Sequence, residues 1–415
     1  MLSGSSRRIF ACAVLGTAAI ALTPATAPAQ SPSAPTPSAR FYVPPPHPEA
    51  IRQGIELLRA HRVRDALSLA ALEATPKAVW VTKGTPSDAR AAVSDTVRRA
   101  SFQHAVPVLV AYNIPGRDCG GLSAGGALTT ADYEAWIDGF AGGIGASRAI
   151  VILEPDGLGL LPSNCGAGYP FTDAQRYEEL NYAVDKLGQG ARTSVYLDGT
   201  HSAWLGVGDI SARLAKAGVL RATGLFTNVS NYRLLDYERK YATWISQCIA
   251  FANDPEEGGW RLGHYDWCAS QYFSPLAPAD HPVNPNDIST WGATDQWFEA
   301  NLGTAQPTAR FVIDTSRNGQ GPWVPPAGKY TDAQDWCNPP GRGVGARPTT
   351  DTGSPLGDAL LWVKVPGESD GTCTRGAPAG SPDPEWGLVD PAAGQWFPQQ
   401  ALQLAQLASP PLLRQ

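Results

Sequence analysis

The sequence lacks the features that would place it around a metal ion, on nucleic acid or in a membrane. Its 7 cysteines include no C-x-x-C pair and its 6 histidines form no H-E-x-x-H cluster, so we expect no metal site and no other cofactor. The formal net charge of −6 offers no basic surface to nucleic acid and favours a neutral ligand. The apolar stretch at residues 9–22 is too short to span a bilayer comfortably.

The N-terminal part of the chain is predicted to be an export signal followed by a tether. A pair of arginines precedes the apolar stretch and an A-x-A cleavage site ends at Ala29, so residues 1–29 are predicted to be a signal peptide of the general secretory or twin-arginine type. Residues 30–40 are rich in proline and serine and are predicted to be the tether. Residues 41–415 are expected to form one large domain, secreted from the cell as a monomer without a membrane contact.

Six cysteines remain once the predicted signal peptide is removed, and an even number is typical of disulfide bonds in an oxidising compartment. The sequence alone allows fifteen pairings of six cysteines. Position narrows them, because two cysteines each follow a candidate active-site aspartate and two flank the last predicted strand. The six are Cys119, Cys165, Cys248, Cys268, Cys337 and Cys373.

An apolar run at residues 149–153 ends in Glu154-Pro155-Asp156. A short unbroken run of β-branched residues is typical of a strand that is buried on both faces, and Pro155 cannot donate to a continuing ladder. Asp156 therefore lies at the carboxyl end of this strand, where enzymes with parallel sheets place their chemistry. A single aspartate at such a position is also typical of a turn or a helix N-cap.

The same pattern recurs along the chain, with an apolar run followed by polar residues. Between the runs lie segments with helical spacing, such as residues 133–140 and 180–187. Roughly seven βα units predict an α/β fold with a parallel sheet, closed or nearly closed into a barrel, with the polar strand ends at one rim. The other runs are residues 79–82, 106–112, 194–197, 224–227, 311–313 and 359–363.

Seven segments resemble the motifs of glycoside hydrolase family 6. They occur in the family's order and cover nearly the whole chain from about residue 40. The resemblance implies a distorted, incomplete TIM-like βα barrel with about seven parallel strands. It also implies an inverting cellulase that hydrolyses β-1,4-glucosidic bonds in cellulose or related β-glucans. The segments are YNIPGRDC (112–119), EPD (154–156), YLDGTHSAW (196–204), NVSNY (228–232), IDTSRNG (313–319), WCNP (336–339) and WVKVPGESDG (362–371).

The resemblance implies catalytic roles for five residues. An inverting glycosidase needs one carboxyl group that protonates the leaving oxygen and one base that activates water, roughly 6.5–9.5 Å apart. Asp156 resembles the general acid and Asp118 the neighbour that raises its pKa. Asp370 resembles the residue proposed as the base, acting directly or through water. Ser123 is expected to hold that water, and Tyr112 to press the sugar ring toward its distorted transition-state shape.

Aromatic and polar residues at the strand ends are expected to bind the substrate. Sugar rings stack their apolar faces on indoles, and their hydroxyl groups need fixed donors and acceptors. Trp204 and Trp336 are the expected stacking platforms, whereas Trp136 is expected in the core because it lies on an amphipathic helix. The residues expected to bind hydroxyl groups are His201, Asp198, Asn231, Lys364 and Glu368.

Four of the charged residues have alternative structural roles. Asp198 is an alternative candidate for orienting loops by hydrogen bonds. Asp370 is an alternative candidate for a salt bridge with Lys364, a role that does not exclude catalysis. Asp314 and Arg317 are expected to form an ion pair at the barrel rim.

The resemblance pairs Cys119 with Cys165 and Cys337 with Cys373, which fastens catalytic loops to one another. A third bridge between Cys248 and Cys268 is inferred because both lie in the long insertion between residues 231 and 314.

The sequence leaves open whether the enzyme cuts internal bonds or chain ends. The insertion around Trp260 and the late loop around Trp386 are typical of a roof over the cleft, which favours exo action. Val207 stands where fungal members carry a second tryptophan platform, and no clear platform is found near Phe41 and Tyr42, which favours endo action. A catalytically idle carbohydrate-binding protein and a hydrolase of another β-glucan are the alternative functions.

Overall fold

The computed structural model describes residue 1, residues 39–255 and residues 259–413. The predicted signal peptide, except for its first residue, and most of the predicted tether lie outside these described residues. From Ala39 on, the described residues belong to one compact unit. None of the helices in the described part of the chain has the length and apolar character that crossing a membrane requires.

Seven parallel strands form a single sheet in the order in which they occur along the chain. Each strand pairs in parallel with the next one, which confirms the predicted α/β fold with about seven parallel strands. The strands are β1 (Val79–Val81), β2 (Val108–Ala111), β3 (Ala149–Leu153), β4 (Thr193–Asp198), β5 (Gly224–Thr227), β6 (Arg310–Asp314) and β7 (Gly357–Leu361).

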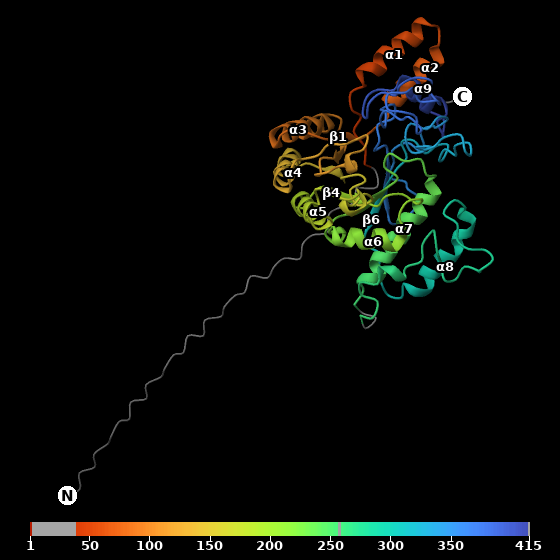
Figure 1. The fold of residues 1–415 in the computed structure, drawn as a ribbon. Coiled ribbons are helices and arrows are strands. Elements are labelled where there is room, and N and C mark those ends of the chain that lie inside the picture. The colour runs from red at the N-terminus through yellow and green to blue at the C-terminus, as the bar shows by residue number, and fades with distance from the viewer. Residues whose placement is uncertain (2–38, 256–258, 414–415) are drawn as a thin grey trace. The chain divides into compact units, whose positions relative to one another are not determined.

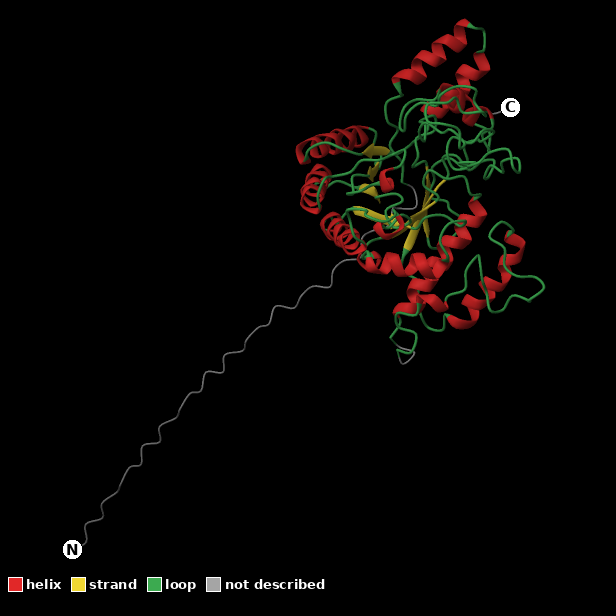
Figure 2. Cartoon of the chain, viewed as in Figure 1, coloured by secondary structure: helices red, strands yellow, loops and turns green. Residues whose placement is uncertain are grey.

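The sheet curls until its first and last strands approach each other. Ala78, just before β1, donates its backbone N–H to the carbonyl of Trp362 at 2.9 Å, and the indole of Trp80 donates to the carbonyl of Val363 at 2.8 Å. Figure 2 shows the curled strands with helices on their outer side. The fold is thus the distorted, incomplete βα barrel that the resemblance implies.

Side chains along each strand alternate between the barrel interior and the helical layer. In β3, Ile150 and Ile152 pack in the interior, whereas Val151 and Leu153 pack against the helices. Both faces of the strand are therefore buried, which explains why its sequence is an unbroken apolar run.

Five of the described helices cover the outer face of the sheet, one packs farther out, and three others form a separate cluster (Figure 1). The covering helices are α3 (Pro86–Phe102), α4 (Thr130–Ile144), α5 (Asp173–Gly188), α6 (Val207–Lys216) and α7 (Leu235–Asn253), and the outer one is α8 (Gly292–Asn301), which packs against α7. The remaining three are α1 (Pro48–Arg59), α2 (Val63–Glu73) and α9 (Pro398–Gln406). The 3-10 turns are η1 (Asp118–Gly120), η2 (Pro162–Asn164), η3 (Val219–Arg221), η4 (Tyr265–Trp267) and η5 (Ile288–Trp291).

Local sequence explains where these helices begin and what they bury. Helices α3 and α5 start at capping boxes, in which Thr85 pairs with Asp88 and Thr172 pairs with Gln175. Each box satisfies backbone N–H groups that the first helical turn leaves without partners. Trp136 of α4 is 1% exposed, which confirms its predicted place in the core.

All three predicted disulfide bonds are present: Cys119–Cys165, Cys248–Cys268 and Cys337–Cys373. The first joins the loop after β2 to the loop after β3, and the third joins the loops after β6 and β7 in the same way. Both therefore tie together neighbouring loops at the carboxyl ends of the strands. The second fastens α7 to the segment that follows it.

Candidate active site

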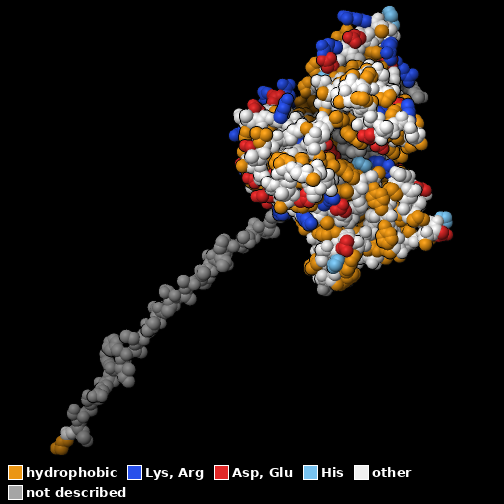
Figure 3. All heavy atoms as spheres, in the orientation of Figure 1, with side chains coloured by type: hydrophobic (Ala, Val, Ile, Leu, Met, Phe, Trp, Pro, Cys, Tyr) orange, Lys and Arg blue, Asp and Glu red, His pale blue; other side chains and the backbone are white. Residues whose placement is uncertain are grey.

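A cleft of about 660 Å³ opens at the carboxyl ends of the strands. Figure 3 shows the surface hollowed there, with charged and histidine side chains inside. Every residue predicted for the site lines this cleft except Asp198. Those that line it are Tyr112, Asp118, Ser123, Asp156, His201, Trp204, Asn231, Trp336, Lys364, Glu368 and Asp370.

Asp156 lies three residues beyond the end of β3, in a left-handed backbone conformation with φ of 65°. This conformation is uncommon for a residue other than glycine and is often found at functional sites. Burial raises the pKa of the Asp156 carboxyl group well above its usual value, and the charges of Asp198, Asp118 and Asp370 raise it further. Asp156 therefore keeps its proton at a pH where an ordinary aspartate has lost it.

Asp198 is buried behind the cleft rather than exposed in it. Its Oδ2 accepts hydrogen bonds from the backbone N–H groups of Leu158 at 3.2 Å and Gly159 at 3.1 Å, and its Oδ1 accepts one from Thr200 at 2.8 Å. That Asp198 binds sugar hydroxyls stays a prediction, and in the structure its two oxygens bind backbone groups. Its alternative role in orienting loops fits these contacts. Burial raises the pKa of Asp198 to about 6.

Two more buried carboxylates hold backbone groups at the strand ends. Glu154 accepts the N–H of Asn113 at 3.0 Å and that of Ile114 at 3.1 Å, and burial raises the pKa of Glu154 to about 7. Asp314 accepts N–H groups from both neighbouring loops, including those of Ser230 at 3.2 Å and Lys364 at 2.9 Å. Sequence reasoning assigned Glu154 no role, although its place beside Asp156 was a signal.

Two cationic side chains hold the Asp370 carboxylate in place. Arg317 Nη1 donates to both carboxylate oxygens at 2.9 and 2.8 Å, and Lys364 Nζ lies 3.2 Å from Oδ1. Burial opposes ionisation, but Arg317 and Lys364 together hold the pKa of Asp370 below its usual value. The expected rim pair of Asp314 with Arg317 is wrong, because Arg317 binds Asp370 instead.

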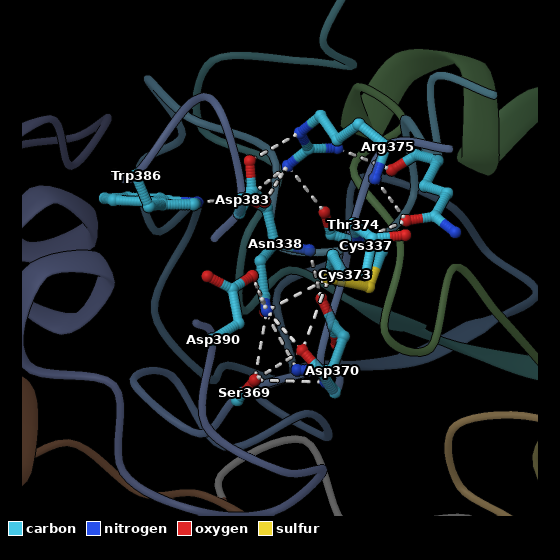
Figure 4. The surroundings of a disulfide bond; sticks show 12 residues. Cys337, Asn338, Ser369, Asp370, Cys373, Thr374, Arg375, Asp383, Trp386 and Asp390 are labelled. Atoms are coloured by element: carbon cyan, nitrogen blue, oxygen red, sulfur yellow. Dashed lines mark hydrogen bonds and ion pairs between the residues drawn. A yellow bond between two sulfur atoms is a disulfide. The ribbon is translucent and has the colours of Figure 1, made fainter. Parts of the chain in front are cut away.

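Asn338, which sequence reasoning left without a role, fixes the backbone and side chain of Asp370 (Figure 4). Its N–H donates to Asp370 Oδ2 at 3.0 Å, and its Oδ1 accepts the N–H of Asp370 at 2.8 Å. Its Nδ2 donates to Ser369 Oγ at 3.0 Å and to Asp390 Oδ2 at 2.8 Å. The only earlier signal was its place in the segment at residues 336–339.

Behind Asn338 lies a buried pair of carboxyl groups, Asp383 and Asp390 (Figure 4). Arg375 Nε donates to Asp383 Oδ1 at 3.0 Å. Burial and the charge of Asp383 raise the pKa of Asp390 to about 7, against the hydrogen bond from Asn338. Cys373 completes the one group in the described part of the chain with metal-ligand spacing, but its sulfur is in a disulfide and Asp383 already binds Arg375, so the group does not suit a metal ion.

A chain of hydroxyl contacts joins the loop after β2 to the cleft. Asp118 Oδ2 accepts the N–H of Ser123 at 2.8 Å and its hydroxyl at 2.9 Å, and Ser123 Oγ lies 3.1 Å from the hydroxyl of Tyr112. Arg117, whose part was not predicted, stacks 4.4 Å from the centre of the Tyr112 ring and donates to the carbonyl of Ser123 at 2.8 Å. Burial and the charge of Asp156 raise the pKa of Tyr112, so its hydroxyl stays neutral.

Trp204 and Trp336, the two residues predicted to be stacking platforms, both line the cleft. Trp336 is 49% exposed, and Trp204 is partly buried beside His201 at a ring distance of 5.7 Å. Burial lowers the pKa of His201 to about 3, with a smaller contribution from Arg233, so the imidazole is neutral. Trp80 of β1 also lines the cleft and was not predicted.

The expected roof is only partly present. Trp260 lies beyond α7 against Phe251 and Trp267 and does not line the cleft, so the expectation that it covers the site is wrong. Trp386 of the late loop donates its indole N–H to the carbonyl of Asn338 at 2.7 Å rather than facing the cleft. That loop contributes only small residues to the wall, at positions 392–394.

Comparisons with known proteins agree on one protein family. The sequence profile described as Glycosyl hydrolases family 6 matches residues 36–408. The chain is 35% identical to Endoglucanase A of Cellulomonas fimi over 90% of this chain and 62% of that protein, and 32% identical to Endoglucanase A of Thermobispora bispora over 82% and 57%. It thus spans about three fifths of the length of these relatives.

One solved structure is similar over almost its whole length. The endoglucanase Cel6 from Mycobacterium tuberculosis, solved in complex with methyl-cellobiosyl-4-deoxy-4-thio-β-D-cellobioside, is 32% identical to this chain with a TM-score of 0.63. The match covers 89% of this chain and 97% of that one.

The Asp390 carboxyl group makes stability depend on pH. Its folded pKa of about 7 lies above the ordinary value, so the folded state holds a proton that the unfolded chain has released. That contribution is complete below about pH 4 and is lost as pH rises through about 7. The side chain in Asp390→Asn cannot ionise. We therefore expect the free energy of unfolding of this variant, relative to that of the wild type, to rise by about 2–4 kcal/mol from pH 4 to pH 8. Urea unfolding at both pH values measures this difference. Asp280→Asn, at an exposed position, is the control, and an equal effect of both variants contradicts the prediction.

Proposed function

The chain belongs to glycosyl hydrolases family 6, and from this premise we propose that it is an inverting β-1,4-glucanase acting on cellulose or a related β-glucan. The observation that carries the proposal is the Asp156 carboxyl group, which lies in the cleft with a raised pKa. A carboxyl group whose pKa is raised above its usual range is what a general acid needs. The proposal also draws on the aromatic platforms Trp204 and Trp336, which suit a sugar polymer.

In this mechanism Asp156 transfers its proton to the glycosidic oxygen as the bond to the anomeric carbon breaks. Water attacks that carbon from the opposite face and gives up a proton, so the product has inverted configuration. Asp370 is ionised but is a weak proton acceptor, because Arg317 and Lys364 lower its pKa. We therefore assign Asp370 first to the stabilisation of positive charge. It also accepts the proton of the attacking water, which reaches it through a second water molecule. Ser123 holds a water near Asp118.

Substrate binding follows from groups that keep a fixed charge state. The indoles of Trp204 and Trp336 stack against glucosyl faces, and the neutral imidazole of His201 exchanges hydrogen bonds with hydroxyl groups. Lys364 donates to the carbonyl of Ser369 at 3.0 Å, which fixes its side chain beside the substrate. An idle carbohydrate-binding protein needs the platforms but has no use for an acid of raised pKa beside a carboxylate of lowered pKa.

We further propose that cleavage is of the endo type. The late loop lines the cleft only with small residues, and none of the described residues around Trp260 belongs to the wall. An open cleft admits the middle of a polymer chain. The relatives described above are endoglucanases, which agrees with this assignment.

Export is part of the same proposal. Three disulfide bonds link the described residues, and such bonds persist in oxidising compartments outside the cytosol. An insoluble polymer cannot enter the cell, so its hydrolase has to work outside.

The first test of the proposal removes the acid. We expect Asp156→Asn to lower turnover on swollen cellulose about 10²- to 10⁴-fold, because the leaving oxygen then receives no proton. The loss should be smaller for an aryl cellotrioside, whose leaving group needs less protonation. Reducing-sugar assays measure the rates, and NMR of the wild-type reaction identifies the first anomer formed. Asp351→Asn, at an exposed position, is the control. Near-normal turnover of Asp156→Asn on cellulose contradicts the assignment.

A second prediction concerns the pH profile. An acid loses activity as pH rises through its pKa, and Asp198 is the strongest neighbouring charge that raises the pKa of Asp156. We expect Asp198→Asn to move the alkaline limb of kcat/KM to lower pH by roughly one unit. Asp314→Asn removes a comparably buried strand-end carboxylate and controls for loop distortion. If both variants have native circular dichroism spectra and the alkaline limb moves equally in both, the effect of Asp198 is not electrostatic.

A third prediction separates endo from exo cleavage. Internal cuts shorten a polymer quickly, so we expect a steep fall in the viscosity of carboxymethylcellulose per reducing end formed, with a spread of oligosaccharides as products. Viscometry and chromatography of the same samples provide both readouts. Cellobiose as the dominant early product, with viscosity nearly unchanged, rules out the endo assignment.

A further inference from the structure

A tight turn at residues 270–274 displays two aromatic side chains to solvent. Tyr272 is 41% exposed and Phe273 is 66% exposed. The turn closes through a hydrogen bond from Ser270 N–H to the carbonyl of Phe273 at 2.7 Å. Ser270 Oγ accepts the N–H groups of both aromatic residues at 3.2 Å. The turn therefore holds the two rings outward by its own backbone.

The turn is also fastened to the body of the barrel from several sides. Gln271 is completely buried, and its Nε2 donates to the carbonyl of Leu205 at 2.8 Å. Thr294 donates to the carbonyl of Ser270 at 2.8 Å, and Ser274 donates to the carbonyl of Ala293 at 2.9 Å. A surface held this firmly loses little conformational entropy when a ligand binds.

The turn continues the cleft beyond its predicted platform. The hydroxyl of Tyr272 donates to the carbonyl of Trp204 at 3.2 Å, and Trp204 lines the cleft. The Tyr272 ring also lies beside Gly206, 3.8 Å from where a Cβ atom of residue 206 would stand. Val207, the position at which a second platform was missing, is completely buried. Aromatic surface next to Trp204 therefore comes from this turn and not from the start of α6.

We propose that Tyr272 and Phe273 extend the carbohydrate-binding surface past Trp204 and bind further glucosyl units of a long β-glucan chain. The inference rests on the proposed glucanase function and names a binding surface of the same cleft. The Tyr272 hydroxyl is occupied by Trp204, so the ring is the part left to contact a ligand. A rigid, exposed aromatic surface suits the apolar face of a sugar, and covering Phe273 removes apolar area from water. We expect a short oligosaccharide held at Asp156 to end before this turn, because neither aromatic residue of the turn lines the cleft itself.

The test compares substrates of two lengths. We expect the double variant Tyr272→Ala/Phe273→Ala to lower the ratio of kcat/KM for cellohexaose to kcat/KM for cellotetraose about 5- to 10-fold. The matched control is Phe102→Ala at the end of α3, where the side chain is 79% exposed and does not line the cleft. We expect the control to leave the ratio unchanged. A natively folded double variant with the wild-type ratio overturns the proposal.

A binding measurement separates this proposal from the proposed function. In the Asp156→Asn background, the two turn substitutions should weaken cellohexaose binding in calorimetry by the same factor as the ratio. If the wild type hydrolyses no glucan but this loss of binding is seen, the glucanase assignment fails and the binding surface stands. If the turn substitutions abolish concentration-dependent dimers in sedimentation and leave cellohexaose binding intact, the surface is a contact between copies and the proposal is overturned.

Discussion

Buried carboxylates that accept backbone N–H groups hold the rim of this barrel together. Glu154 follows β3, Asp198 ends β4 and Asp314 ends β6, and each accepts hydrogen bonds from a neighbouring loop. A charged or polar acceptor inside a protein is costly unless it is satisfied, and these acceptors are satisfied by loops that would otherwise be free. These carboxylates therefore help to fix the loops that carry cleft residues.

Burial and neighbouring charges shift the pKa values of two aspartates of the cleft in opposite directions. On one side, desolvation and the crowding of acidic groups leave Asp156 protonated. On the other side, Arg317 and Lys364 keep Asp370 ionised despite its burial. One aspartate therefore tends to hold its proton and the other to release it, because of their surroundings alone. Such a difference is the usual basis for assigning the acid and the base of an active site. The stabilising rim and the catalytic cleft share one set of interactions.

Much of the fold and most of the cleft were predictable because strand ends leave a local signature. An apolar run followed by polar residues marks where a parallel strand meets the rim, and the rim gathers those residues in space. Which acid faces the cleft was not predictable, since Asp156 and Asp198 both follow buried strands. The partner of Arg317 was assigned to Asp314, three residues away, but Asp370 lies 53 residues on. Asn338 acts through contacts with residues from two later loops, and no local pattern encodes them.

The packing of α1 and α2 against α9 brings the first and last helices of the domain into one cluster. Gln53 of α1 donates to the carbonyl of Pro398 at 2.8 Å, and Gln406 of α9 donates to Asp65 of α2 at 2.7 Å. Contacts of such long sequence separation form only after the C-terminus has been synthesised, and they slow folding. Helices α1 and α2 therefore keep an apolar face exposed until α9 has been synthesised. Removing α9 would leave that face open to aggregation, although no residue of α9 lines the cleft.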